Sequence, residues 1–555
     1  MNDLVFYGGL KGVAFGNQQF TVRNLSFNNV VTAISQIWDW GWTYKSITIN
    51  NCTTGLDMSN GGRTGQSVGS VVFIDSSITN TKVGFLTAHD STSQPPTAGS
   101  LIIENVQLNN VPVAVQGPNG QTALQGTTGQ TTIAGWGEGH QYTPNGPNNF
   151  EGNITPNNRP GSLLSGSRYY ERSKPQYEGN APTDFLSIRD AGARGDGNTD
   201  DTNAINNALR SGKIVYFDSG IYKVTSTIQI PAGARILGES YPVIMSSGSY
   251  FGDMRNPKPV VRIGNPGDRG SIEWSDTIVS TQGAQAGAIL IEYNLISGTP
   301  SGMWDVHTRI GGFAGSHLQL AQCPTTPNSA AVNTNCIAAF MSMHITQQAS
   351  GLYMENNWFW TADHDIDDPN DTQTTIYAGR GLYIESNTGT FWLVGTAVEH
   401  HTLYQYQLAN TKNIFMGQIQ TETAYYQPQP DATVPFPVVS SLNDPDFNAA
   451  CQGKPANCKL GWGLRVINSQ SILIYGAGLY SFFNNYSTTC SNQGGGENCQ
   501  LRILSVEGGY TNGVNVYNLN TVGTTEQIDR DGNRLALFSD NLDGFVDTIA
   551  QYRSN

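Results

Sequence analysis

A short pattern recurs four times between residues 20 and 115, and it restricts the possible folds more than any other feature of the chain. Each copy has a short apolar strand, a polar turn rich in Asn, Ser or Thr, and a second short strand, and successive copies begin about 25 to 30 residues apart. A unit of this size buries its apolar side only by stacking on the next unit. Because leucine-rich, ankyrin and helical repeat patterns are absent, the repeats predict a parallel β-helix. The copies are FTVRNLSFNNVVTAI, KSITINNCTTGLDM, GSVVFIDSSITNTKVGFL and GSLIIENVQLNNVPVAV.

The composition agrees with an all-β chain. Charged residues make up 13% of the 555 residues, which include 63 Gly and 24 Tyr, and this balance suits strands with tight turns better than helices. The net charge of −14 argues against a nucleic-acid partner, which requires clustered Lys and Arg. No segment approaches the apolar length of a membrane span. A neutral polymer such as a glucan is compatible with this surface, and a polyanion such as pectin is less so.

Two regions of repeats are separated by a stretch without periodicity. Residues 117–182 are rich in Gly, Pro and Asn, which predicts loops that close the first solenoid and then a linker. At Asp184 a new domain opens, and its first helix, after an N-cap at residues 198–202, covers the open end of a second strand stack. We expect a first β-helix at 1–160, a linker at 161–183, and a second β-helix with a C-terminal extension at 184–555.

Six of the seven cysteines lie in close sequence pairs, which indicates local disulfides and an oxidising compartment. The pairs are Cys323 with Cys336, Cys451 with Cys458, and Cys490 with Cys499, and Cys52 is left over. Sequons at Asn24, Asn51, Asn153, Asn370 and Asn485 also suit a secreted glycoprotein. The first residues have no signal-peptide pattern.

Two glutamates, Glu399 and Glu422, each follow a strand-like run and are 23 residues apart. One β-helix turn takes about two dozen residues, and turns stack about 4.8 Å apart, so the two acids would face each other on neighbouring turns. Glycoside hydrolysis uses such a pair of carboxyl groups. We expect Glu422, partly buried near Tyr425 and Tyr426, to be the acid, and Glu399 to raise the pKa of Glu422 or help position water. Otherwise they are two surface acids.

Aromatic and polar residues near this pair are candidates for sugar binding, because indole faces stack on pyranose rings. Trp360 is the strongest candidate. The run DHDIDDPND lacks the spacing of a calcium loop, so we expect Asp363 and His364 to serve a sugar subsite and predict neither metal nor cofactor. His400 and His401 are expected to orient Glu399. The further candidates are Trp358, Trp38, Trp40, Trp42 and Tyr425.

Long motifs along the chain resemble one enzyme family. They include WDWGWT (38–43), RSKPQYE (172–178), DAGARGDGNTDDTNAINNAL (190–209), NPKPVVRIG (256–264), WTADHDID (360–367), the whole of 399–428 and LIYGAGLYSFF (473–483). Together they resemble glycoside hydrolase family 55, whose members are mostly fungal exo-β-1,3-glucanases with two tandem right-handed parallel β-helices. The resemblance implies an inverting enzyme with Glu422 as general acid and a water held by groups that match Gln36 and Ser59, which are also 23 apart.

One motif departs from the family pattern. Members open both β-helices with a GAKGDG-like cap, and this chain has one copy, at residues 192–197. The chain thus resembles a member without its secretion signal and the first turns of domain one. We expect an extracellular, monomeric enzyme that acts on β-1,3-glucan. The alternatives are a polysaccharide lyase, which needs basic residues where only Lys412 is found, and a carbohydrate-binding adhesin, which needs no carboxylate pair.

Overall fold

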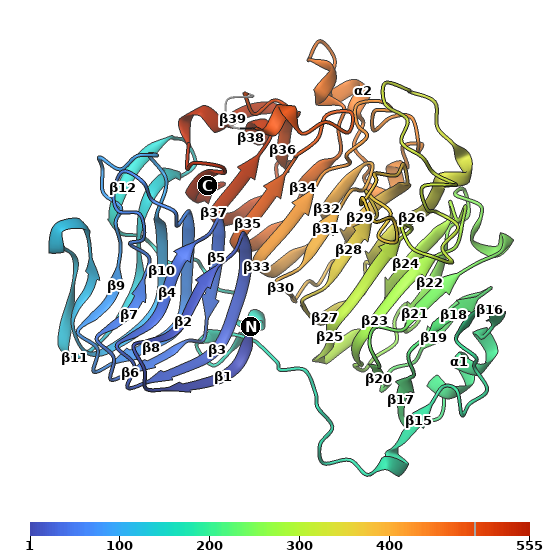
Figure 1. Ribbon diagram of the computed structural model, residues 1–555, viewed down its shortest axis with the longest axis horizontal. Coiled ribbons are helices and arrows are strands. Elements are labelled where there is room, and N and C mark those ends of the chain that lie inside the picture. Colours follow the sequence, from blue (N-terminus) through green and yellow to red (C-terminus); the bar gives the residue numbers. More distant parts are fainter. Residues whose placement is uncertain (493–495) are drawn as a thin grey trace.

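The computed structural model describes residues 1–492 and 496–555, and it contains two parallel β-helices that lie side by side (Figure 1). The four sequence repeats form strands of the first β-helix, stacked in parallel register, so the β-helix prediction is confirmed. Its strands are β1 (Asn2–Tyr7), β2 (Lys11–Gly16), β3 (Gln19–Asn28), β4 (Thr32–Trp38), β5 (Gly41–Lys45), β6 (Thr48–Asn50), β7 (Thr54–Asp57), β8 (Ser70–Thr79), β9 (Val83–Leu86) and β10 (Ser100–Gln116).

Polar turns of this β-helix are held by asparagine ladders. Asn29, Asn51, Asn80 and Asn110 have positive φ angles, a conformation that Asn adopts more readily than most residues. The Asn51 amide donates to Asn29 Oδ1 at 2.7 Å, and the Asn110 amide donates to Asn80 Oδ1 at 3.0 Å. The repeated asparagines therefore serve the stacking of turns.

The stretch after the fourth repeat corrects the prediction of loops. Strand β11 (Thr122–Tyr142) runs antiparallel along β10, and β12 (Asn148–Asn153) runs antiparallel along β11. The first half of β11 is mostly exposed, so it has no alternating apolar pattern that sequence reasoning detects. The backbone of β11 pairs with β10, the last strand of the stack. This pairing satisfies the exposed N–H and C=O groups of that edge.

The second β-helix begins at a short helix, as predicted. Helix α1 (Thr202–Leu209) buries Ile205, Ala208 and Leu209 against the first turns. One parallel sheet contains β15 (Phe185–Ser187), β16 (Asp196–Asp200), β17 (Ile214–Phe217), β18 (Ile221–Val224), β20 (Arg235–Gly238), β21 (Val243–Ser246), β23 (Glu273–Thr281), β25 (Ile296–Ile310), β27 (Ser350–Glu355), β28 (Trp358–Thr361), β30 (Phe391–Val394), β31 (Ala397–Glu399), β33 (Lys412–Glu422), β35 (Gln470–Tyr480) and β37 (Asn512–Val522).

A second sheet of this β-helix closes each turn on the opposite side of the core. Its strands are parallel except for the last pair, β38 and β39, which are antiparallel. They are β19 (Ile228–Ile230), β22 (Lys258–Ile263), β24 (Ala288–Tyr293), β26 (Ile337–Ile345), β29 (Tyr377–Ile384), β32 (Tyr404–Ala409), β34 (Trp462–Ile467), β36 (Gln500–Glu507), β38 (Thr524–Arg530) and β39 (Asn533–Leu537).

The chain ties the two β-helices together through a small hairpin and through its last strand. Between them, β13 (Leu164–Ser165) and β14 (Arg168–Tyr169) form a small hairpin that buries Leu163 and Tyr169 against second-β-helix aromatics. Strand β40 (Asp547–Arg553) pairs antiparallel with β37 and parallel with the end of β11. Strand β40 therefore connects strands of both β-helices in one sheet.

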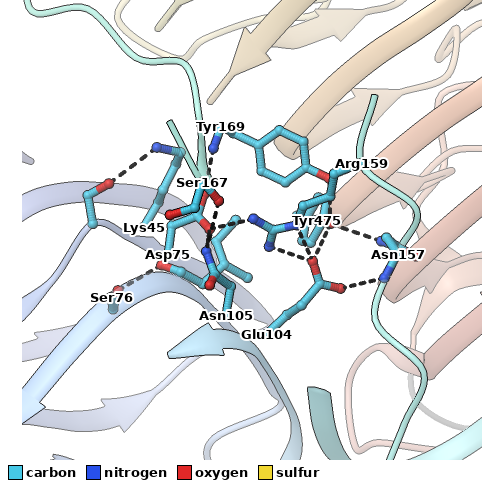
Figure 2. Close-up of polar contacts among 12 residues, drawn as sticks. Lys45, Asp75, Ser76, Glu104, Asn105, Asn157, Arg159, Ser167, Tyr169 and Tyr475 are labelled. Atoms are coloured by element: carbon cyan, nitrogen blue, oxygen red, sulfur yellow. Dashed lines mark hydrogen bonds and ion pairs between the residues drawn. The ribbon is translucent and has the colours of Figure 1, made fainter. Parts of the chain in front are cut away.

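A buried polar network joins the first β-helix to the second (Figure 2). Glu104 of the first β-helix accepts hydrogen bonds from Arg159 Nε at 2.8 Å and from the hydroxyls of Tyr475 and Tyr517, each at 2.8 Å. Arg159 also pairs with Asp75 at 2.6 Å. Since the carboxylates and the guanidinium are paired and hydrogen-bonded, the network specifies one relative position of the two β-helices.

Loops on the second β-helix carry the disulfides. The three bonds join Cys323 to Cys336, Cys451 to Cys458, and Cys490 to Cys499, and Cys52 is free and buried, all as predicted. The second bond begins directly after helix α2 (Phe447–Ala450). Within residues 1–492 and 496–555, no helix has the length and apolar character needed to cross a membrane.

Candidate active site

Glu399 and Glu422 face each other as register partners at the ends of strands β31 and β33. The residues before them, Val398 and Thr421, are fully buried on the core side, so alternation along each strand turns both glutamates outward. Neighbouring strands lie about 4.8 Å apart. The predicted pairing of the two acids on one face is therefore confirmed.

The environment of Glu422 favours its protonated form. Burial raises the pKa of Glu422 well above its usual range, and the nearby charges of Glu399 and Asp363 raise it further. A quarter of its side chain remains exposed. The Gln420 amide donates to Glu422 Oε1 at 3.3 Å. Glu422 is thus a carboxyl group that holds a proton and is open to a substrate.

Glu399 is more deeply buried and is anchored by an indole. Burial raises the pKa of Glu399, and the His400 charge together with the hydrogen bond from Trp358 lowers it. Trp358 Nε1 donates to Glu399 Oε2 at 2.7 Å. Glu399 is therefore held in place by the Trp358 indole, and its pKa is raised by burial.

His400 lies between Glu422 and a third carboxylate, that of Asp363. Its Nε2 lies 3.8 Å from Glu422 Oε2 and 3.9 Å from Asp363 Oδ1, and its Nδ1 lies 3.0 Å from the carbonyl of Thr423. Because a carbonyl only accepts, Nδ1 carries a hydrogen and the ring orientation is set. His364 Nδ1 lies 2.8 Å from Asp363 Oδ1. Asp363 and His364 thus lie where the sequence placed them, beside the acid pair.

The row of outward side chains that contains the pair ends at a buried aromatic residue on each side. Beyond Glu422 the next register partner is Tyr480, which is buried and packs against Trp40 of the first β-helix with ring centroids 5.4 Å apart. Tyr480 donates to Gln19 Oε1 at 3.2 Å. In the other direction the register partner of Glu399 is Trp360, which is also buried. Trp358, two residues earlier on β28, stacks on Trp360 with ring centroids 5.0 Å apart and is 39% exposed, so it provides the exposed aromatic area beside the pair.

Several candidate residues lie elsewhere than expected. Tyr425 is fully buried, donates to the Ala362 carbonyl at 2.9 Å, and supports the site from inside instead of contacting sugar. Trp360 is also buried, so Trp358 offers the larger sugar-binding face. His401 faces Ser342 at 2.7 Å and does not orient Glu399. Trp38 is 38% exposed at the end of β4, whereas Trp42 is in the first core.

The two residues matched to water positioning are not brought together. Gln36 is fully buried in the first β-helix and accepts a hydrogen bond from the Tyr44 hydroxyl. Ser59 donates to Asp57 Oδ1 at 2.7 Å and lines a cavity with Arg63 and Thr87. The register of β4 and β7 pairs Ser35 with Asp57, so Gln36 and Ser59 fall one residue out of step, and Ser59 lies beyond the end of β7.

Sequence reasoning missed three groups that complete the site, namely Gln420, Tyr480 and Trp40 in its role of closing the row. Gln420 is two residues before Glu422, so strand alternation alone places it on the same face. Tyr480 requires the register of β33 with β35, and Trp40 requires the docking of the first β-helix, neither of which leaves a local sequence signal.

Comparisons with known proteins agree with this geometry. The family model described as rhamnogalacturonase A/epimerase, pectate lyase-like, matches residues 1–57 and 185–413. A glucan 1,3-beta-glucosidase of Cochliobolus carbonum is 47% identical over 99% of this chain and 69% of its own length. A probable glucan endo-1,3-beta-glucosidase of Arthroderma benhamiae is 39% identical over 100% of this chain and 73% of its own length.

Among solved structures, sacteLam55A from Streptomyces sp. SirexAA-E matches with 15% identity and a TM-score of 0.43, covering 100% of this chain and 90% of that one. The family assignment rests on the sequence relatives, because two of them are well above 30% identity and are matched over more than two thirds of their length. The chain belongs to glycoside hydrolase family 55, the family of the fungal glucan 1,3-β-glucosidases.

Proposed function

We propose that this protein hydrolyses β-1,3-glucan from a chain end and releases glucose. The observation that carries the proposal is the facing pair of Glu399 and Glu422, with the buried Tyr480 as the next register partner of Glu422 and the exposed Trp358 hydrogen-bonded to Glu399. The pair supplies the two carboxyl functions of glycoside hydrolysis. Tyr480 and Trp40 border the pair on one side, which favours room for a single terminal glucosyl unit there and therefore action at a chain end.

In this mechanism Glu422 is the general acid. Its raised pKa keeps the proton on the carboxyl group at working pH, and the proton passes to the glycosidic oxygen as the bond to the departing chain breaks. Water attacks the opposite face of the sugar ring, which gives inversion, and the proton that this water loses passes to solvent. Glu422 leaves the step as a carboxylate and regains its proton from solvent.

Glu399, Asp363 and His400 set the electrostatics of the step. Glu399 and Asp363 raise the pKa of Glu422 through their charges, so they resist early loss of its proton. His400 Nε2, 3.8 Å from Glu422, is placed to favour the carboxylate formed after proton transfer. The buried position of Gln36 and the separate position of Ser59 leave Glu399 as the stronger candidate for orienting water.

The proposal also includes the substrate class and the location of the protein. The substrate is a neutral β-glucan, in agreement with a site built from indoles, amides and a carboxylate pair. Three disulfides support an extracellular protein. The division into 1–160, 161–183 and 184–555, and a monomeric state, remain part of the proposal. A lyase is disfavoured because its uronate substrate would meet three carboxylates, from Glu399, Glu422 and Asp363.

The test is release of glucose from laminarin and from reduced laminarioligosaccharides, followed for the wild type and Glu422→Gln. We expect glucose as the main early product, with the α-anomer first in NMR spectra, and loss of release in the variant. Oligosaccharides as the main early products would contradict action at chain ends. Retained activity in Glu422→Gln would contradict the assignment of the acid.

A further inference from the structure

A strip of outward side chains runs beside the acid pair, two residues earlier on each strand, and continues along the second β-helix. Gln420, Ala397, Trp358, His307 and Ile278 occupy corresponding positions on β33, β31, β28, β25 and β23. We call these five residues the open strip. Successive strands lie about 4.8 Å apart, so His307 lies about 10 Å from the level of Ala397. This distance corresponds to a few sugar units of an extended chain.

Tyr241 extends the open strip beyond Trp358. It lies in the turn between β20 and β21, is 43% exposed, and packs on His307 with ring centroids 5.4 Å apart. His307 Nδ1 in turn accepts the backbone N–H of Trp358 at 3.0 Å. His307 therefore links Tyr241, through ring packing, to the backbone of Trp358, whose indole holds Glu399.

The backbone at Tyr241 is unfavourable for its side chain. Ser240 and Tyr241 have consecutive φ angles of 55° and 59°, a left-handed conformation that a bulky residue rarely adopts. The same corner of the following turns holds Asp276, Asp305 and Asn356, whose residue types adopt positive φ more readily. Two strained residues that hold an aromatic ring toward solvent indicate a use outside packing.

The surroundings of the open strip carry little net charge. Lys174 from the linker pairs with Asp276 at 2.8 Å and with Asp305 at 3.0 Å. Burial lowers the pKa of His307 to about 4, so its ring is neutral above that pH. The Arg309 guanidinium lies over the Phe313 ring at 4.2 Å. An uncharged sugar chain fits such a surface better than a polyanion does.

We propose that Tyr241, supported by His307, is a distal binding site for a glucosyl unit of a β-1,3-glucan whose chain end lies at Glu422. The inference rests on the proposed function and adds to it a preference for longer chains. A chain too short to reach Tyr241 gains nothing from it. A chain long enough to reach from the acid pair past His307 to Tyr241 gains the stacking energy of one aromatic face.

The test compares Tyr241→Ala and Tyr241→Asn with the wild type on laminaribiose and laminarihexaose. We expect kcat/KM for the hexaose to fall by about three- to tenfold, the loss of one aromatic contact, with kcat/KM for the biose unchanged. Asn tolerates the left-handed backbone, so this variant separates loss of the ring from strain. Tyr241→Phe keeps the ring and should retain most activity, and Tyr510→Ala removes another tyrosine, 76% exposed, as the matched control.

Two outcomes would overturn the site. One is an equal fall for biose and hexaose in both variants, and the other is no fall for either substrate. If the wild type releases glucose from no oligosaccharide, the proposed function fails first. The distal site is then tested by calorimetric binding of laminarihexaose to Glu422→Gln and to the double variant with Tyr241→Ala, where equal affinity would reject it.

Discussion

Glu422 and His400 are held in contact by two neighbouring strand ends of the second β-helix, with His400 Nε2 3.8 Å from Glu422 Oε2. His400 has a positive φ of 66°, which turns its ring out of the strand direction. Its Nδ1 donates to the Thr423 carbonyl, one residue beyond Glu422. The backbone carbonyl of Thr423 at the end of β33 thus orients the His400 ring that faces Glu422.

Replacing Glu422 by Gln should remove catalysis while keeping the fold. Gln preserves the shape of the side chain and its contact with Gln420 but has no proton to donate, so we expect kcat to fall by about 10² to 10⁴ with little change in KM. The measurement is steady-state glucose release. Glu178→Gln, an exposed glutamate on the linker, is the matched control and should behave as wild type.

Replacing Glu399 by Gln should move the alkaline limb of the activity profile to lower pH. The Glu399 charge raises the pKa of Glu422, so removing it lowers the pH at which Glu422 loses its proton. The Gln side chain still accepts the Trp358 indole hydrogen bond. A profile of kcat/KM against pH measures the shift, and an alkaline limb that stays in place or moves upward would refute the coupling.

The two adjacent tryptophans should respond differently to truncation. Trp358→Ala removes an exposed indole that also holds Glu399, so we expect a raised KM and a reduced kcat with a nearly unchanged melting temperature. Trp360→Ala leaves a cavity at a buried position and should cost about 3 to 5 kcal/mol of stability. Thermal unfolding and kinetics on the same samples separate the effects, and the reverse assignment would show that Trp360 is the sugar contact.

The buried network between the two β-helices should be sensitive to loss of its cation. Arg159→Ala leaves Glu104 and Asp75 as unpaired buried carboxylates, so we expect a loss of about 3 to 5 kcal/mol in unfolding free energy. Arg63→Ala, which removes a surface pair with Asp90, is the control and should cost at most about 1 kcal/mol. Equal urea midpoints for the two variants would contradict this role of the network.

Three buried aspartates predict that the free energy of unfolding falls as pH rises. Burial raises the pKa of Asp39 to about 8 and the pKa of Asp547 to about 9, and it also raises the pKa of Asp543. The folded state therefore binds protons more tightly than the unfolded chain, whose Asp pKa is about 3.9. The contribution of these groups to the free energy of unfolding is full below about pH 4 and decreases as the pH rises toward 8 to 9.

The measurement is the melting temperature between pH 4 and pH 9 for the wild type and Asp543→Asn. We expect a falling curve for the wild type and a flatter one for the variant, since Asn stays neutral at every pH. Asp253→Asn, an exposed aspartate on the outer surface, is the control. Parallel curves for Asp543→Asn and the wild type would show that Asp543 does not titrate with folding.

The sequence alone determined the β-helix fold, the disulfide pairs and the facing of Glu399 with Glu422, because each depends on local spacing. A repeat that buries its apolar face only by stacking fixes the period, and that period predicts that the two glutamates are neighbours, as the register of β31 and β33 confirms. The same reasoning failed for residues 122–153, where an exposed strand pairs through its backbone and leaves no apolar alternation.

Tertiary structure alone decided which side chains complete the site. Gln36 and Ser59 have the same spacing as the glutamates, yet they fall one residue out of register, with Gln36 buried in β4 and Ser59 beyond the end of β7. Tyr425 and Trp360 were expected to contact sugar and are buried, whereas Trp358 is exposed. Tyr480 and Trp40 meet through the docking of two β-helices, a contact between residues 440 positions apart that no local pattern encodes.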